Sequence, residues 1–147
     1  MNDKILQLVK LKAKGFCCSQ MMLILALEKQ GKTNPDLVKS VGGLCFGIYG
    51  SGGACGALTG GVCLISLFAG KGSEEETAND QYITMIMELS DWFHNMANEE
   101  FGGIQCDEIL KKFPDRSMCG QIVADTYEKC MDILIKYGFD PVKSLNG

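Results

Sequence analysis

Apolar residues recur at intervals of three and four along most of the chain, which is the spacing of one face of an α-helix. The clearest stripe predicts a long helix and consists of Tyr82, Met85, Ile86, Leu89, Trp92, Phe93, Met96 and Ala97. Core packing accounts for its methionines and aromatic rings without a cofactor. No stretch alternates apolar and polar residues as a half-buried strand does. The pattern therefore predicts an all-α protein.

Six further helices are predicted from the same spacing and from capping signals. Their expected ranges are 3–14, 18–30, a short helix from Pro35, 54–68, a short helix from Cys106 to Pro114, and 117–137. Expected N-caps are Asn34, Ser117 and, for the long helix, Ser73 in a capping box with Glu76. We expect a single domain over residues 1–147, a bundle of about seven helices.

Residues 40–70 contain no charged side chain, and ten of these positions are glycine. The segment is long enough to cross a bilayer. So many glycines make a continuous helix unfavourable, and the segment lacks the flanking basic cluster of a membrane span. We expect a buried Gly-rich loop over 42–53, followed by a buried helix, and no membrane span.

The chain of 147 residues has 14 basic and 18 acidic residues, a formal charge of −4. No basic block or basic helix face occurs, so a nucleic acid is not an expected partner. The N-terminal residues lack the uninterrupted apolar region of a signal peptide, which predicts a cytoplasmic protein. In a reducing cytosol, the eight cysteines stay available for metal or redox chemistry.

The segment GSGGACGALTGG at 50–61 places one cysteine among glycines. It matches neither the phosphate-loop pattern nor the dinucleotide-binding pattern. Cys55 instead falls at a predicted helix N-terminus, as do Cys18, Cys106 and Cys119. The free N–H groups and the dipole of a helix N-terminus favour a thiolate, and hence metal ligation or nucleophilic chemistry.

These four cysteines are the candidate site, on the assumption that they converge in space. Four helix ends supply roughly +2, too little to offset four thiolates. A divalent metal ion would leave about −2, whereas without metal only one or two thiols should ionise. Three glycines would let the backbone approach whatever Cys55 holds: Gly52, Gly53 and Gly56.

The four cysteines, with CGALTG at 55–60, also resemble a family of redox-active proteins. Its signature, C_GCAxxG_C_C, is a cysteine, a CGAxxG motif and two later cysteines. The likeness runs from FCCSQ at 16–20 to the last helix, and it implies redox activity in bacterial or archaeal oxidoreductase settings. Cys17 departs from the pattern, because a small polar cap is expected there. Either Cys17 or Cys18 is then the first ligand, and we expect Cys18.

The remaining cysteines and the single histidine have simpler interpretations. Cys130 and Cys63 lie in apolar helix faces, where thiols pack as small hydrophobic groups. The role of Cys45 stays open, and one interpretation places it in the same pocket as Cys55. His94 is expected to be structural or solvent-facing. The CxxCH motif of covalent haem is absent, as is CxxC.

Three functions follow from these residues. The first is an electron-transfer or redox accessory protein, a possible oxidoreductase, in which the four cysteines ligate an iron–sulfur cluster, [2Fe–2S]. The second is a metal-free thiol oxidoreductase or redox sensor that cycles between dithiol and disulfide. The third is a structural zinc protein. The expected partners are a redox protein that the sequence does not identify and a second copy of the chain.

Overall fold

The computed structural model describes residues 2–143, which contain seven right-handed α-helices and no sheet. The helices are α1 (Asp3–Ala13), α2 (Cys18–Lys29), α3 (Pro35–Ser40), α5 (Gly56–Ala69), α6 (Tyr82–Phe101), α7 (Cys106–Lys112) and α8 (Cys119–Lys136). A 3₁₀ turn, η1 (Gly42–Leu44), and a helical segment, α4 (Cys45–Gly50), lie between α3 and α5. The predicted all-α fold of about seven helices is confirmed.

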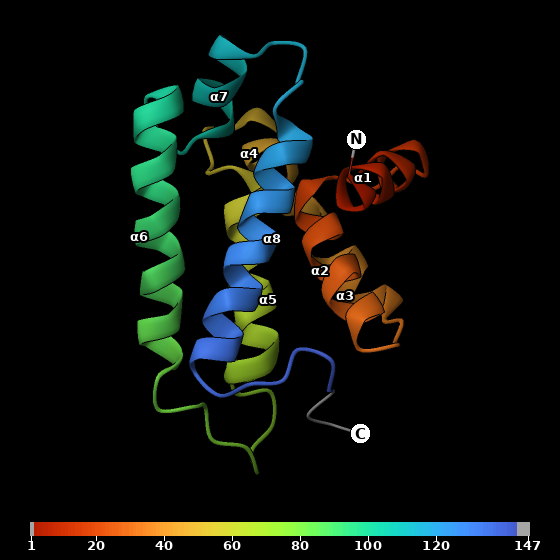
Figure 1. Ribbon diagram of the computed structural model, residues 1–147, viewed down its shortest axis with the longest axis vertical. Coiled ribbons are helices and arrows are strands. Elements are labelled where there is room, and N and C mark those ends of the chain that lie inside the picture. Colours follow the sequence, from red (N-terminus) through yellow and green to blue (C-terminus); the bar gives the residue numbers. More distant parts are fainter. Residues whose placement is uncertain (1, 144–147) are drawn as a thin grey trace.

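Helix α5 lies at the centre of the bundle and packs against α2, α6 and α8 (Figure 1). It is apolar nearly all round, so it can be covered on several sides. Helix α1 lies across the end of the bundle against α8. The core includes one fully buried leucine from each of the four central helices: Leu23, Leu64, Leu89 and Leu134.

Two adjacent glycines allow the other helices to approach α5 closely. A Cβ atom on Gly60 would lie 2.8 Å from the Cα atom of Ser19 in α2. A Cβ atom on Gly61 would lie 3.1 Å from Leu89 in α6 and 3.2 Å from the Sγ atom of Cys130 in α8. Part of the glycine content of 50–61 therefore serves helix packing, a function that the sequence analysis missed.

Helix ends follow the predicted caps at some positions and not at others. The side chain of Asn34 accepts a hydrogen bond from the Leu37 N–H at 3.1 Å, as predicted. The other two predicted caps are wrong. Glu76 accepts from the backbone of Gly72, and the long helix begins only at Tyr82. The Ser117 N–H donates to the Asp115 carboxylate at 3.0 Å, and α8 begins at Cys119.

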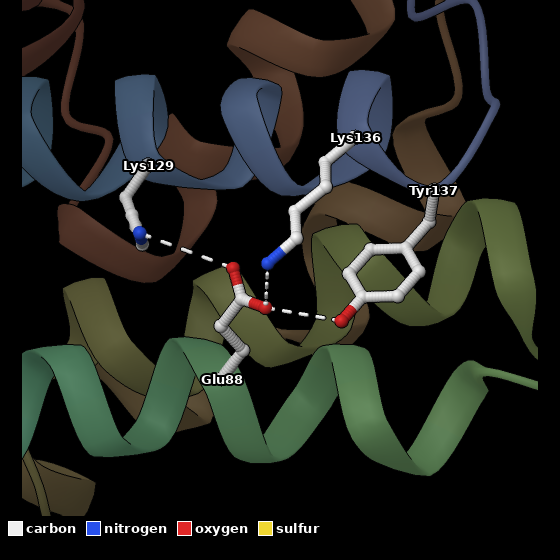
Figure 2. Close-up of polar contacts among 4 residues, drawn as sticks. All are labelled: Glu88, Lys129, Lys136 and Tyr137. Carbon is white, nitrogen blue, oxygen red and sulfur yellow. Dashed lines mark hydrogen bonds and ion pairs between the residues drawn. The ribbon is translucent and has the colours of Figure 1, made fainter.

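A polar cluster joins α6 to α8 on the surface (Figure 2). The Glu88 carboxylate accepts hydrogen bonds from the Lys136 ammonium at 2.8 Å and from the Tyr137 hydroxyl at 3.0 Å. Lys129 adds a longer ion pair at 4.0 Å. The hydrogen bond from Lys136 lowers the pKa of Glu88 below its ordinary value. This contact fixes the position of the C-terminal end of α8 against α6.

The expected loop over 42–53 contains an unusual backbone conformation. Four consecutive residues of α4, Phe46 to Tyr49, have φ between 51° and 63° and ψ between 33° and 55°, a left-handed helical turn. Three of them are not glycine, and each such residue costs roughly 1–2 kcal/mol. Strain of this kind concentrates at functional sites. The prediction of an irregular loop is therefore corrected for this segment.

Within residues 2–143, no helix combines the length and the apolar character needed to span a membrane.

Candidate functional site

The four candidate cysteines lie at four helix starts. Cys18, Cys106 and Cys119 are the first residues of α2, α7 and α8, and Cys55 directly precedes α5. All four line one cavity of about 420 Å³. The predicted positions at helix N-termini are confirmed, and the four residues share one cavity. Their action as ligands stays a prediction.

A short backbone pairing holds Cys55 and Cys106 beside one another. Ala54 and Gln105 form an isolated antiparallel bridge. On either side of it, the Cys55 N–H donates to Ile104 at 2.8 Å and the Cys106 N–H donates to Gly53 at 3.2 Å. Helices α5 and α7 therefore begin together, with one cysteine at each start.

Cys18 and Cys119 reach the cavity from two other helices. The Sγ atom of Cys18 lies so close to Gly56 that a Cβ atom there would overlap with it. The Cys119 N–H donates to the carbonyl of Arg116 at 3.1 Å, in the turn that starts α8. Glycine at position 56, which also lines the cavity, is thus what gives the Cys18 thiol its space.

The other glycines near the site differ from the prediction. Gly53 packs on Gly47, to whose carbonyl it donates a hydrogen bond at 2.9 Å, and it helps position Cys106. Gly52 has φ +88° and open space around it, so it makes a turn, and it does not line the cavity. Gly47 was missed, although a Cβ atom there would lie 2.9 Å from the Cβ atom of Cys106.

Most of the cavity wall is apolar, with two cations and one carboxylate in it. Aliphatic residues of α1 and α7 line it, together with the charged side chains of Lys12, Asp115 and Arg116. The Arg116 guanidinium lies 4.4 Å from the ring centre of Phe46. Phe46 is the first left-handed residue of α4, and it also lines the cavity. The strained segment therefore forms part of the wall.

Burial controls the protonation of the cavity thiols. It raises the pKa of Cys55 to about 12, and the nearby Cys18 thiol raises it less strongly. Burial also raises the pKa of Cys106 and of Cys119, an effect that the Arg116 charge partly opposes. A backbone N–H at Ala57 lowers the pKa of Cys55, as expected at a helix start, but by less than burial raises it. The thiol form of these three cysteines is therefore favoured at neutral pH when no cation is bound, which agrees with the expectation that most of the four thiols are not ionised without metal and corrects the expectation that a helix start alone favours the thiolate.

Cys17 and Cys45 form a disulfide, with their Cα atoms 6.0 Å apart. Cys17 is therefore not a free thiol, which favours Cys18 as the first ligand. Cys45 is fully buried beside Ser19 and does not line the cavity, so the interpretation that it shares a pocket with Cys55 is excluded. No local pattern predicted the pairing of Cys17 with Cys45, because the two residues are 28 positions apart.

The remaining candidates fall outside the cavity. Cys130 is fully buried in the core, as predicted. Cys63 is only half-buried and packs against the edge of the core, so the prediction of a core thiol holds for it only in part. His94 binds the carbonyl of Ser90, one turn earlier in α6, at 2.8 Å, consistent with a structural histidine.

The four thiols surround the cavity without meeting at a point. Across residues 2–143, no three His, Cys, Asp or Glu side chains are grouped closely enough to form a ready-made metal site. The donor set nonetheless suits a soft metal centre, because thiolates are the ligands that iron–sulfur clusters and zinc prefer.

Fold and site together define an all-α, cysteine-rich protein with free thiols around one cavity. The chain belongs to the family described as "putative redox-active protein (C_GCAxxG_C_C)", whose model matches residues 16–133. The matched range contains CGALTG at 55–60 and all four candidate cysteines. No curated protein and no solved structure matches the chain.

Proposed function

We propose that the protein is an electron-transfer or redox accessory protein whose Cys18, Cys55, Cys106 and Cys119 hold an iron–sulfur cluster, [2Fe–2S]. The observation that carries the proposal is the presence of four free thiols, each at a helix start, around one cavity. A volume of about 420 Å³ exceeds what a single ion requires. When bound, such a cluster supplies one-electron transfer.

The residues around the cavity suit a negatively charged group. Four thiolates carry more charge than the metal neutralises, and four helix N-termini supply roughly +2 in opposition. Lys12 and Arg116 line the same cavity and add two positive charges, and the Asp115 carboxylate in the same wall offsets one of them. The apolar remainder of the wall lowers the local polarity, which strengthens these interactions.

Protonation of the thiols predicts how loading depends on pH. Cys55, Cys106 and Cys119 have raised pKa values, so binding of a metal must release their protons. Loading should therefore become tighter as pH rises. The same raised pKa values disfavour a metal-free dithiol mechanism at these cysteines, because the thiolate is the nucleophile.

Zinc remains the alternative occupant, because four cysteines also form structural zinc sites. A zinc ion would hold the four helix starts together without electron transfer. The family's description as redox-active favours a cluster over zinc, because zinc has no redox chemistry.

A redox partner protein and self-association complete the proposal. Electron transfer requires a donor and an acceptor, neither of which the residues identify. A dimer is suggested by exposed apolar side chains on α6 and α8: Ile83, Met87 and Ile135. Light scattering of the purified protein would measure its mass in solution, and a monomer would argue against the dimer.

The test is the composition of protein purified without oxygen. Iron, zinc and acid-labile sulfide are measured per chain, and the visible spectrum is recorded before and after dithionite. Equal amounts of iron and sulfide, with colour that dithionite bleaches, would support the cluster. Stoichiometric zinc in colourless protein would support the structural alternative, and metal-free protein would leave thiol chemistry.

A further inference from the structure

The wall of the cavity contains a second sulfur pair that the proposed cluster does not use. Cys17 precedes α2 and lines the cavity, whereas its partner Cys45 begins α4 and has no exposed surface. The two sulfurs of this disulfide are therefore unequal. A thiol that enters the cavity can reach the sulfur of Cys17, and Cys45 is then the leaving sulfur.

Ser19 makes the surroundings of Cys45 better suited to a thiol than to a disulfide. The Ser19 hydroxyl lies 2.8 Å from the carbonyl oxygen of Val41 and 2.9 Å from the Sγ atom of Cys45. A carbonyl oxygen only accepts, so the single hydroxyl proton is donated to Val41. In the disulfide, the sulfur has no proton, and lone pairs face one another across this buried contact. In the reduced state, the Cys45 S–H can be donated to the Ser19 oxygen.

We propose that Cys17 and Cys45 are a redox-active pair that exchanges two electrons with a dithiol compound or dithiol protein. One thiolate of the dithiol attacks the sulfur of Cys17, which breaks the Cys17–Cys45 bond and forms a mixed disulfide. Cys45 leaves and takes the proton that the attacking thiol released. The second thiol of the dithiol then attacks its own mixed-disulfide sulfur, and Cys17 leaves with that proton. The dithiol is oxidised to a disulfide, and the pair is reduced to two thiols.

Reduction has a structural consequence at the four-cysteine cavity. The disulfide joins the start of α2 to the start of the left-handed turn, and Phe46, the residue after Cys45, lines the cavity beneath Arg116. Breaking the bond removes the covalent constraint on this strained segment. The redox state of the Cys17–Cys45 pair thereby controls the conformation of this part of the cavity wall, whether or not the four free thiols hold a cofactor.

The test is a redox titration of the folded full-length protein with mixtures of reduced and oxidised dithiothreitol. Free thiols are blocked with one alkylating reagent, the remaining disulfides are reduced, and the new thiols are labelled with a second reagent. Tandem mass spectrometry then distinguishes Cys17 from its neighbour Cys18. We expect a reversible step of two thiols, located at Cys17 and Cys45, while circular dichroism shows that the helices remain.

Three variants make the test specific. The double variant Cys17→Ser/Cys45→Ser should lose the two-thiol step, and the control Cys63→Ser should keep it, because Cys63 lies outside the cavity. Ser19→Ala removes the acceptor for the Cys45 thiol. It should require a ratio of reduced to oxidised dithiothreitol about two- to fivefold higher, the equivalent of one modest hydrogen bond.

Three results would overturn the proposal. Reduction of Cys17–Cys45 only after unfolding in urea would make the disulfide purely structural. A two-thiol step at other cysteines would place the redox chemistry elsewhere. A Ser19→Ala variant that is reduced as easily as the wild type would refute the account of Ser19. Iron and sulfide content are measured separately, so a failure of the cluster proposal is not mistaken for a failure of this one.

Discussion

Replacing Gly60 by alanine tests the packing that brings Cys18 to the cavity. The new Cβ atom would lie 2.8 Å from the Cα atom of Ser19, 2.9 Å from its carbonyl oxygen and 3.1 Å from the Cβ atom of Met22. Carbon atoms normally pack at about 3.5–4.0 Å. Helix α2 must therefore move away by more than half an ångström, because the first two of these atoms belong to its backbone.

The size of the effect follows from two opposing terms. Overpacking of this kind costs about 1–3 kcal/mol, and alanine gains about 1 kcal/mol over glycine in a helix interior. With backbone atoms in the way, we expect a net loss of about 1–2 kcal/mol. In a chain of this length, that lowers the melting temperature by roughly 2–8 °C. Cys18 begins α2, so cofactor loading should fall as well.

Gly61→Ala is the matched control in the same helix. Its new Cβ atom meets only side-chain atoms, Leu89 Cδ2, Cys130 Sγ and Thr126 Cγ2, at 3.1–3.4 Å. These side chains can adjust, so the helix gain offsets the crowding and stability should change by less than about 1 kcal/mol. Thermal and urea unfolding of both variants measure the difference. The reasoning is refuted if Gly60→Ala is as stable as Gly61→Ala.

Two further predictions test the surface cluster and the strained turn. Glu88→Gln should lower the free energy of unfolding by less than about 1 kcal/mol at neutral pH. The folded-state pKa of Glu88 is below its ordinary value of 4.5, so this loss should be present above pH 4.5 and should disappear as the pH falls through the folded-state pKa. Urea unfolding of both proteins across this pH range measures the difference. A constant difference down to low pH would contradict this assignment. Gly47→Ala should reduce cofactor loading, because its Cβ atom would lie 2.9 Å from the Cβ atom of Cys106. Gly52→Ala has open space around its Cβ atom but a φ of +88°, so it should lower the free energy of unfolding by about 1–2 kcal/mol and leave loading unchanged. Equal loading in these two variants would argue against a positioning role for Gly47.

Local signals predicted the helices well and the caps less well. The apolar stripe of 82–97 appears in α6 with Met85, Leu89, Phe93 and Ala97 buried, and Asn34 caps α3. Ser73 and Glu76 have the spacing of a capping box, yet the chain forms a separate turn there before α6. A capping motif indicates only a local preference, and the chain between α5 and α6 does not follow it.

The residues of the candidate site could be predicted from the sequence, whereas the protonation of its thiols and the Cys17–Cys45 disulfide could not. The four cysteines were found because each lies at a helix start, which local sequence reveals. At Cys55, burial raises the pKa of the thiol more than the helix N-terminus lowers it. The burial comes from residues that only the tertiary structure brings around this thiol. The left-handed turn at Phe46 and the link from Cys45 to Cys17 likewise depend on contacts between distant segments.

The most direct test of the four-cysteine site compares Cys106→Ser with Cys130→Ser, prepared together without oxygen. Cys106 lines the cavity, whereas Cys130 is fully buried in the core, with its sulfur 3.7 Å from the carbonyl oxygen of Gly61. The shorter C–O bond of serine leaves the new hydroxyl too far from that carbonyl, so Cys130→Ser should cost about 1–3 kcal/mol. Iron and acid-labile sulfide per chain are then measured alongside thermal unfolding. We predict that Cys106→Ser loses iron and sulfide, while Cys130→Ser keeps iron and sulfide but melts at a lower temperature. Full iron and sulfide content in Cys106→Ser, together with their loss from Cys130→Ser, would contradict the four-cysteine site.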